Sequence, residues 1–469
     1  MENCHFLVVT FPAQGHINPT LQFSKLLAKS GVKVTFATSF AAIVRMNKIE
    51  VSLPKNLTIV PFSDGYDDGW ASVQDFRHYY TTLVTIGSKN LEKLIMEQAK
   101  EGHPVTHVVY STLMSWVGEL IQKLKIPSTL LWIQPAALFV IYYHYFHEYG
   151  EIIGECDETN SIIELPGLPP LTSRDLPSFL LKSNPDIYNF ALPSMKKHFE
   201  VLEKNHGDRP TILVNSFDGL EVEALRAVEK IKFVAVGPLV PSAYLDGKDP
   251  FDASFGGDLL HSSNGDSVIE WLNSKDKNSV VYVAFGSYSE LGMKQMEEIG
   301  KGLLQSKKPF LWVIRKAKNG EKSEDKLGCR DELEKQGMIV EWCSQVEVLS
   351  HSSVGCFLSH CGWNSSIESL VCGVPVFGIP QWTDQTTNVK LIQDVWKTGI
   401  RAVANEEGII EADEIRRGLE IVMESEEMRN NAAKWRGLAI DAAKDGGSSN
   451  VNLKAFVDEV QAASSAEKM

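Results

Sequence analysis

The sequence predicts an α/β protein made of two doubly wound domains, each a parallel β-sheet covered by helices on both faces. The chain has 469 residues, which at roughly 150 residues per domain is enough for two or three domains. Short apolar runs alternate with segments of helix length, as they do in sheets whose strands are buried on both faces. A stretch rich in Pro, Gly, Asp and Ser, residues 238–265, interrupts this alternation near the middle.

The first half begins with a strand, a helix and a second strand. Residues 5–10 form a largely apolar run, residues 15–30 have a helical pattern, and residues 32–37 form the next apolar run, which together predict a βαβ unit. Further strands are predicted at residues 106–110, 127–132, 211–215 and 232–236. The first half is therefore expected to be a Rossmann-like domain.

The second half repeats this rhythm after the interrupting stretch. Strands are predicted at residues 280–285, 310–314, 338–342, 355–359 and 374–378, with helices that begin near Leu291, Asn364 and Asp384. The charged residues 316–334 have no apolar periodicity and are predicted to be a solvated loop. The expected organisation is a first domain over residues 1–240, a linker over 241–265, a second domain over 266–445 and a final segment over 446–469.

Composition excludes several classes of protein. The hydrophobic content of 43% and the charged content of 23% are ordinary for a folded globular chain. The formal net charge of −14 disfavours nucleic acid and anionic lipid as partners. It does not exclude a nucleotide ligand, because helix N-termini bind phosphate locally.

The seven cysteines include no CxxC pair, so neither a disulfide framework nor a zinc site is expected. The first residues do not resemble a secretory signal, and no 18-residue apolar run follows. We expect a cytoplasmic protein without stable membrane insertion.

Common nucleotide and hydrolase motifs are absent. Neither half carries GxGxxG after its first strand, and GxxxxGK[ST] and GxSxG are missing. Dinucleotide oxidoreductases, P-loop phosphotransferases and α/β-hydrolases therefore lose their main support. Two doubly wound domains are still expected to bind a ligand in a cleft at the carboxyl ends of their strands.

Polar and aromatic residues gather at strand ends between residues 338 and 385. A predicted strand ends at His360, and Asn364 and Ser365 then begin a helix, so backbone amides and the helix dipole form a phosphate site to which His360 can also donate. Glu368, one turn further on, can accept from the two hydroxyls of a ribose. Trp342 offers a flat face on which a base can stack. These residues predict a nucleotide diphosphate site.

The segment from Trp342 to Gln385 spans 44 positions and closely resembles the plant secondary product glycosyltransferase signature of family 1 UDP-glycosyltransferases. The resemblance implies the GT-B architecture, a UDP-glucose donor, a small-molecule acceptor and no metal. It implies that Trp342 and Cys343 contact uracil and that Gln345 and Glu368 hold the ribose. It implies that the diphosphate is bound by His360, Asn364 and Ser365. The sugar would be contacted by Trp382, Asp384 and Gln385, and Trp363 would line the pocket. A terminal Gln favours glucose, whereas His there would suggest galactose.

The resemblance covers nearly the whole chain. In residues 280–287, Gly286 permits close approach of the backbone and Ser287 would reach a phosphate. Residues 446–450 precede a final helix that, in this family, crosses back onto the N-terminal domain. A monomer is favoured.

His16 is the predicted catalytic base. It lies at the start of the helix after the first strand, so it is expected to point at the cleft rather than into a core. Transfer to a hydroxyl needs a base, and imidazole suits neutral pH. The resemblance implies the same role, in an inverting single displacement that yields a β-glycoside, with leaving-group charge met by His360 and the helix dipole.

Ser111 occupies the position where most relatives carry an Asp that orients this His. A hydroxyl can hydrogen-bond to imidazole but supplies no negative charge, so His16 is expected to be less basic than with a carboxylate neighbour. The departure allows an inactive enzyme, a substitute acid elsewhere, or an acceptor that needs little help. We favour the third interpretation, with a phenol or a carboxylic acid as the acceptor.

Residues 63–70 resemble a mobile loop over the acceptor pocket. The sequences of residues 63–70 and 131–135 resemble those of the subgroup that contains anthocyanin 5-O-glucosyltransferases and crocetin and indole-acetate glucosyltransferases. Candidate acceptor contacts are Tyr66, Trp70, Gln134 and Tyr142, although core packing is an equal alternative for the aromatic run that includes Tyr142.

Two other functions remain open. A nucleotide-sugar epimerase or hydrolase would process the donor without an acceptor. A sugar-nucleotide sensor would have lost catalysis at Ser111, although retention of His16 argues against it.

Overall fold

The computed structural model describes residues 4–46, 53–69, 76–154, 161–181, 191–204, 209–245, 247–256, 265–289, 291–315 and 327–466. The chain divides into two compact units. The first comprises Met1–Leu259 with Asp441–Met469, and the second comprises Leu260–Ile440.

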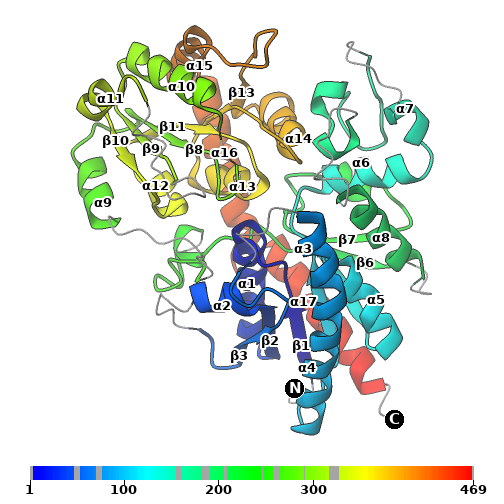
Figure 1. The fold of residues 1–469 in the computed structure, drawn as a ribbon. Coiled ribbons are helices and arrows are strands. Elements are labelled where there is room, and N and C mark those ends of the chain that lie inside the picture. The colour runs from blue at the N-terminus through cyan, green and yellow to red at the C-terminus, as the bar shows by residue number, and fades with distance from the viewer. Residues whose placement is uncertain are drawn as a thin grey trace. The chain divides into compact units, whose positions relative to one another are not determined.

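The first unit contains a seven-stranded parallel sheet in the order β3-β2-β1-β4-β5-β6-β7 (Figure 1). Its strands are β1 (His5–Val9), β2 (Lys33–Ser39), β3 (Leu57–Phe62), β4 (His107–Ser111), β5 (Ser128–Trp132), β6 (Thr211–Val214) and β7 (Lys232–Ala235). The order reverses direction between β1 and β4, and this reversal defines the switch point at which such sheets bind ligands.

Helices cover this sheet and are mostly connections between parallel strands. They are α1 (Gln14–Lys29), α2 (Phe40–Met46), α3 (Phe76–Thr82), α4 (Ser88–Lys100), α5 (Ser115–Leu124), α6 (Ala136–Phe146), α7 (Gly150–Gly154) and α8 (Ala191–Lys204). The final helix, α17 (Ser448–Ala466), belongs to the same unit. Its Phe456 and Val457 share one core cluster with Phe6 and Val8 of β1 and with Leu21 of α1.

The second unit contains a six-stranded parallel sheet in the order β10-β9-β8-β11-β12-β13. The strands are β8 (Val280–Ala284), β9 (Phe310–Val313), β10 (Met338–Val340), β11 (Val354–Ser359), β12 (Val376–Gly378) and β13 (Gly399–Arg401). The helices are α9 (Gly265–Asn273), α10 (Met293–Ser306), α11 (Arg330–Gln336), α12 (Gln345–Ser350), α13 (Trp363–Cys372), α14 (Gln385–Lys390), α15 (Ala412–Glu424) and α16 (Glu426–Ala443), the last of which runs into the first unit. Here the switch point lies between β8 and β11.

The central strand β8 shows why the strands read as unbroken apolar runs. Val281 and Val283 belong to a core cluster on one face of the sheet, with residues of α10 and α15. Val280 and Tyr282 belong to a second cluster on the other face, with residues of α9 and α12. Since alternate residues point to opposite faces and both faces are covered, every position of the strand is buried. The predicted fold class is confirmed for each unit.

Two strands, β3 and β13, were not predicted. Both lie at sheet edges, β3 is only partly buried, and β13 has three residues that end in an arginine, so neither reads as an unbroken apolar run. The loop predicted over residues 316–334 is wrong at its end, because α11 begins at Arg330 and buries Leu333 against α10.

The described residues of the predicted linker, 241–245 and 247–256, pack against the first unit. Asp252 is 8% exposed and accepts hydrogen bonds from Lys25 and Gln22 of α1, both at 2.9 Å. Lys25 also donates to the carbonyl of Ser254 at 2.8 Å. A buried ion pair that also satisfies an amide and a carbonyl fixes this segment to α1.

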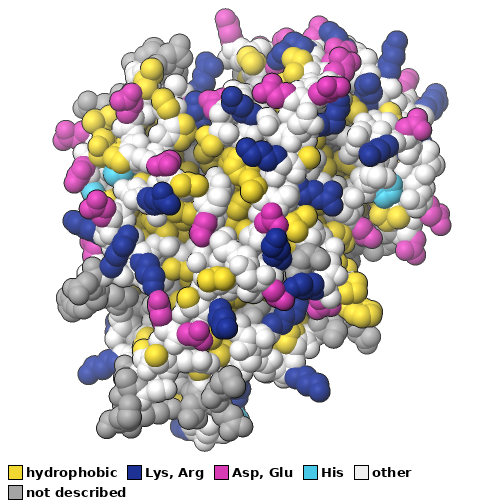
Figure 2. Space-filling view, turned by 180° about the vertical axis from the view of Figure 1, so that it is seen from behind, with side chains coloured by type: hydrophobic (Ala, Val, Ile, Leu, Met, Phe, Trp, Pro, Cys, Tyr) yellow, Lys and Arg dark blue, Asp and Glu magenta, His cyan; other side chains and the backbone are white. Residues whose placement is uncertain are grey.

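The surface shows no concentration of one charge on the face drawn in Figure 2, where Lys and Arg side chains are interspersed with Asp and Glu among the described residues. This distribution gives no basic footprint for a nucleic acid on that face. None of the helices in the described ranges is both long enough and apolar enough to cross a membrane.

Candidate active site

The first unit places His16 and Ser111 at its switch point. Ser111 is the last residue of β4, and His16 lies in the first turn of α1, which follows β1. The turn into the helix is fixed by the N–H groups of His16 and Ile17, which both donate to the carbonyl of Ala13 at 2.9 Å. The predicted base therefore stands at the carboxyl edge of the sheet.

The imidazole of His16 is half-buried and packs against an aromatic ring. The ring centroids of His16 and Phe11 are 5.3 Å apart. Nδ1 is buried and has no hydrogen-bond partner among the described residues. Burial lowers the pKa of His16 to about 4, and the backbone of Thr112 acts in the opposite direction. His16 is therefore neutral at pH 7 and can accept a proton.

Ser111 does not serve as the partner of His16. Its hydroxyl is fully buried and lies 3.0 Å from Oγ1 of Thr10, which in turn donates to Oγ1 of Thr20 at 3.2 Å. Ser111 also faces the carbonyl of Thr112 at 3.5 Å. No carboxylate is among the groups that shift the pKa of His16. A substitute acid is thus not found in the described part of the chain, and the low basicity expected for His16 has burial as its main cause.

The second unit places Gly286 and His360 at its switch point, after β8 and β11. Gly286 has φ +72°, a conformation that side chains rarely adopt. A Cβ built on Gly286 would lie 2.6 Å from Nε2 of His360, and a Cβ on Gly362 would lie equally close to it. Both glycines therefore make room for one imidazole. His360 itself is 8% exposed.

His360 is also neutral at pH 7. Burial lowers its pKa to about 4, the positive charge of Arg315 contributes in the same direction, and the backbone of Ala284 opposes them. Nδ1 is buried without a partner among the described residues. A neutral imidazole still carries one N–H with which it can donate to a phosphate oxygen.

The turn after β11 directs the N-terminus of α13 toward this position. Gly362 is the N-cap of α13, and the first hydrogen bond of the helix runs from the N–H of Ser366 to the carbonyl of Gly362 at 2.9 Å. The backbone N–H groups at the start of α13, before Ser366, have no carbonyl partner within the helix. Together with the helix dipole they favour binding of an anion. The carbonyl of Cys361, which has φ +62°, accepts from Nδ2 of Asn388 at 2.8 Å. Nδ2 of Asn388 also donates to Asp384 at 2.7 Å, so this residue, which was not predicted, ties the turn to the predicted sugar contact.

The predicted ribose residues are already joined. Nε2 of Gln345, at the start of α12, donates to Oε2 of Glu368 and to Oγ of Ser365, both at 2.8 Å. Glu368 and Ser365 lie on the same face of α13, with Asn364 beside them in its first turn. Glu368 is 5% exposed. A buried carboxylate held in this way has a fixed orientation and can accept from vicinal hydroxyls.

The predicted uracil residues follow β10. Trp342 is half-buried two residues after the strand ends, and Cys343 is buried, with its sulfur 3.7 Å from the hydroxyl of Tyr282. Burial raises the pKa of the Cys343 thiol to about 12, so it remains protonated. The backbone of Cys343, rather than its side chain, is left for a contact with a base.

The end of the segment from Trp342 to Gln385 forms a turn before α14. Oε1 of Gln385 accepts from the N–H groups of Gln381 at 2.8 Å and Trp382 at 3.1 Å. Because its oxygen holds this turn, only the amide NH₂ of Gln385 remains to contact a sugar. Nε1 of Trp382 donates to Oγ of Ser289 at 3.2 Å, which links the turn to the loop after β8 that contains Ser287. Trp363, by contrast, is 3% exposed and packs against Trp396 at 5.9 Å between ring centroids.

The candidate acceptor residues have different surroundings. Tyr66 is half-buried, and its ring packs against Tyr79, which donates to the buried Asp64 at 2.9 Å. Gln134 is half-buried just after β5, near the switch point. Tyr142 is 2% exposed among the aromatic rings of α6. Trp70 lies outside the described residues.

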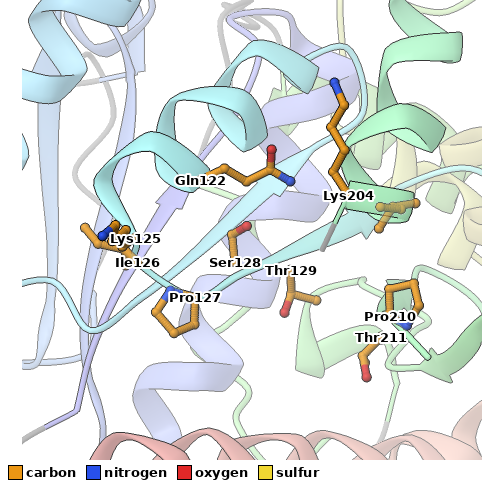
Figure 3. A pocket seen from close by; sticks show the side chains of 10 residues that line it. Gln122, Lys125, Ile126, Pro127, Ser128, Thr129, Lys204, Pro210 and Thr211 are labelled. Atoms are coloured by element: carbon orange, nitrogen blue, oxygen red, sulfur yellow. The ribbon is translucent and has the colours of Figure 1, made fainter. Parts of the chain in front are cut away.

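A separate hollow of about 570 Å³ lies at the opposite edge of the first sheet (Figure 3). Its lining comes from the end of α5, the start of β5, the end of α8 and the start of β6, and includes Gln122, Ser128, Lys204 and Thr211. Since these are the amino ends of the strands, the hollow is distinct from the switch point. Across the described ranges, no group of three or more His, Cys, Asp or Glu residues could hold a metal ion.

Known proteins resemble this chain over nearly its whole length. Residues 208–443 match the family described as UDP-glucoronosyl and UDP-glucosyl transferase, and residues 2–65 match the glycosyltransferase N-terminal domain. The chain is 52% identical over 463 residues to the chloroplastic crocetin glucosyltransferase of Gardenia jasminoides, covering 97% of each. It is 48% identical to anthocyanidin 3-O-glucoside 5-O-glucosyltransferase 1 of Perilla frutescens, covering 97% of this chain and 98% of the relative. The crystal structure of Os79 from O. sativa in complex with UDP matches with a TM-score of 0.84 at 31% identity, covering 97% of this chain and 100% of that one.

Proposed function

The chain belongs to the UDP-glucoronosyl and UDP-glucosyl transferase family of plant family 1 enzymes, and on that premise we propose that it transfers glucose with inversion from UDP-glucose to a phenolic hydroxyl or carboxylate of a small apolar metabolite. It is a UDP-sugar-dependent glycosyltransferase of the GT-B fold. The proposal rests on His16, which stands at the switch point with an imidazole that is neutral at pH 7 and an Nδ1 that has no hydrogen-bond partner among the described residues.

In the proposed reaction, the acceptor oxygen attacks the anomeric carbon of glucose from the face opposite UDP. The bond between that carbon and the β-phosphate oxygen breaks, and UDP leaves with the electron pair. For a phenol, the proton of the hydroxyl passes to His16; a carboxylate has no proton to lose at neutral pH. Attack opposite the leaving group converts the α-linked donor into a β-glucoside or glucose ester.

Charge that develops on the leaving diphosphate is met, in this proposal, by the N-terminus of α13 and by an N–H of His360. The amides and dipole of α13 are fixed before the reaction, and preorganised donors of this kind stabilise developing charge without reorganisation. The glycines at 286 and 362 support the proposal, since they bring the backbone close to the imidazole. We propose that no metal takes part.

The nature of the acceptor follows from the basicity of His16. A histidine whose pKa is about 4 is a weak base, and a phenol with a pKa near 10 needs far less assistance than an aliphatic alcohol. The relatives named for crocetin and for the 5-O position of anthocyanidin glucosides support activated plant acceptors of this kind.

The proposal is tested by incubating the protein with UDP-glucose and a panel of phenols, carboxylic acids and aliphatic alcohols. We expect UDP release that depends on the acceptor, with products one hexose heavier by mass spectrometry. Rapid turnover of UDP-glucose alone would instead favour an epimerase or hydrolase. Binding without UDP release across the panel would favour a sensor, and a marked preference for aliphatic alcohols would overturn the acceptor assignment.

We further propose that the enzyme acts in the cytoplasm as a monomer. Because the crocetin relative is named as chloroplastic, a fluorescent fusion in plant cells should decide the location. Light scattering coupled to gel filtration should give a mass near 52.2 kDa for a monomer.

A further inference from the structure

Arg315 follows β9 and reaches across to the loop after β8. Nη1 donates to the carbonyl of Ser287 at 2.7 Å, and Nη2 donates to the carbonyl of Ser289. The guanidinium is half-buried. Because two parallel donors engage two carbonyls two residues apart, the fork fixes the shape of the loop as a lysine could not.

The same loop is joined at its other side to the turn before α14. Ser289 accepts from the indole N–H of Trp382 at 3.2 Å, and the ring of Tyr288 lies 5.4 Å from the ring of Trp382 between centroids. Trp382 also donates its backbone N–H to Gln385 at 3.1 Å. A continuous set of hydrogen bonds therefore runs from Arg315 through Ser289 to the two residues proposed to contact the sugar.

Arg315 also acts on the diphosphate side. Gly286 begins the loop that Arg315 holds, and the backbone at Gly286 lies against the imidazole of His360. The positive charge of Arg315 contributes to the lowered pKa of His360. The guanidinium thus influences both the shape of the loop and the electrostatics beside the proposed phosphate position.

We infer that Arg315 is a positioning residue for the donor, which couples the loop at the diphosphate to the tryptophan at the sugar. This role rests on the proposed function, since it requires UDP-glucose as the ligand. Arg315 acts through Ser287, Ser289 and Trp382. Its hydrogen bonds to Ser287 and Ser289 run to the loop after β8, whereas the residues proposed for uracil and ribose follow β10 and lie on α12 and α13.

The test is calorimetric binding of UMP, UDP and UDP-glucose to the full chain and to Arg315→Met. We expect the affinity for UMP to change by less than about twofold. The affinity for UDP should fall by about threefold, and that for UDP-glucose by about tenfold or more, since a hydrogen bond to a charged group is lost and the sugar contact is released. Arg315→Lys, which keeps the charge and loses the fork, should recover part of the UDP affinity but little of the preference for UDP-glucose.

Two further variants separate the coupling from general damage. Ser289→Ala removes the acceptor of Trp382 and leaves the loop backbone in place, so it should weaken UDP-glucose binding by about threefold and leave UDP within twofold. Arg416→Met is the matched control, because Arg416 pairs with Glu420 on the surface of α15 and should affect none of the three ligands.

The outcomes are distinct. Equal losses for all three ligands in Arg315→Met, or UDP-glucose binding unchanged in both Arg315→Met and Ser289→Ala, would overturn the role of Arg315 alone. Should Arg315→Met fail to fold, the role of Arg315 is tested with Ser289→Ala and Arg315→Lys, by comparing their losses of affinity for UMP, UDP and UDP-glucose. Failure of the wild-type protein to bind UDP-glucose would overturn the proposed function, and this role with it.

Discussion

Substitution of Gly286 by alanine should damage the donor site through two separable effects. The first is backbone strain, since φ at Gly286 is +72° and an L-residue there costs roughly 1–2 kcal/mol. The second is a collision, since the new Cβ would lie 2.6 Å from Nε2 of His360. His360 is buried and must move, so the hydrogen bond proposed between its imidazole and the diphosphate would be lost. That loss is worth about 1.5–3 kcal/mol, or roughly tenfold to more than a hundredfold in affinity.

Two other glycines isolate the two effects. Gly408 has φ +77° but nothing within 4 Å of its missing Cβ, so Gly408→Ala carries the strain alone. Gly362 has φ −60° and the same 2.6 Å approach to His360, so Gly362→Ala carries the collision with little strain.

The assays are thermal unfolding and calorimetric binding of UDP. Gly408→Ala should lower the melting temperature of the second unit by about 2–8 °C and leave UDP binding unchanged. Gly362→Ala should weaken UDP binding about tenfold or more, and Gly286→Ala should show both losses. If Gly286→Ala bound UDP as tightly as Gly408→Ala does, the collision with His360 would have no part in donor binding.

The remaining predictions concern His16, Ser111, pH and metal. His16→Ala should lower kcat by about a hundredfold or more with a phenolic acceptor while the Kd for UDP-glucose stays within twofold; equal kcat values would exclude His16 as the base. Ser111→Ala should change kcat by less than about threefold, since its hydrogen bonds run to Thr10 and the Thr112 carbonyl; a large fall would show that Ser111 acts on His16. Burial lowers the pKa of His107 to about 4 and that of His198 to about 3. Unfolded histidines titrate near 6.5, so the unfolded chain binds more protons below that pH, and stability should be full above pH 6.5 and fall by about 2 kcal/mol for each group at pH 5; urea unfolding that is equal at pH 7.5 and 5 would contradict this. Initial rates should be unchanged by excess EDTA, and a loss that added Mg²⁺ restores would disprove the metal-free mechanism.

Most of the strands that could be predicted from the sequence lie inside a sheet and are buried on both faces. β8 reads as an unbroken apolar run because Val281 and Tyr282 face different cores. The edge strand β3 contains Pro61 and partly exposed positions, and pairs with β2. Its pattern therefore carries neither the unbroken run nor a clean alternation, and the prediction missed it.

The residues of the candidate site also differ in how well the sequence could predict their positions. Residues close together in the sequence, such as His360 and the start of α13, could be placed from local pattern alone. Other contacts depend on which strands are neighbours. The pairing of β1 with β4 matches Val9 to Tyr110 and so brings Thr10 beside Ser111. The hydroxyl of Ser111, which was expected near His16, therefore hydrogen-bonds with Thr10. Arg315 was missed for the same reason, because β9 lies beside β8 only in the folded sheet.

The proposed function requires that glucose pass from UDP-glucose to an acceptor with inversion at the anomeric carbon. Proton NMR of the product formed with a phenolic acceptor tests this most directly, since the coupling between H1 and H2 of the glucosyl unit distinguishes the two anomers. We expect a β-glucoside that forms with the wild-type protein and is lost with His16→Ala. An α-glucoside, or a β-glucoside formed equally well by His16→Ala, would contradict it.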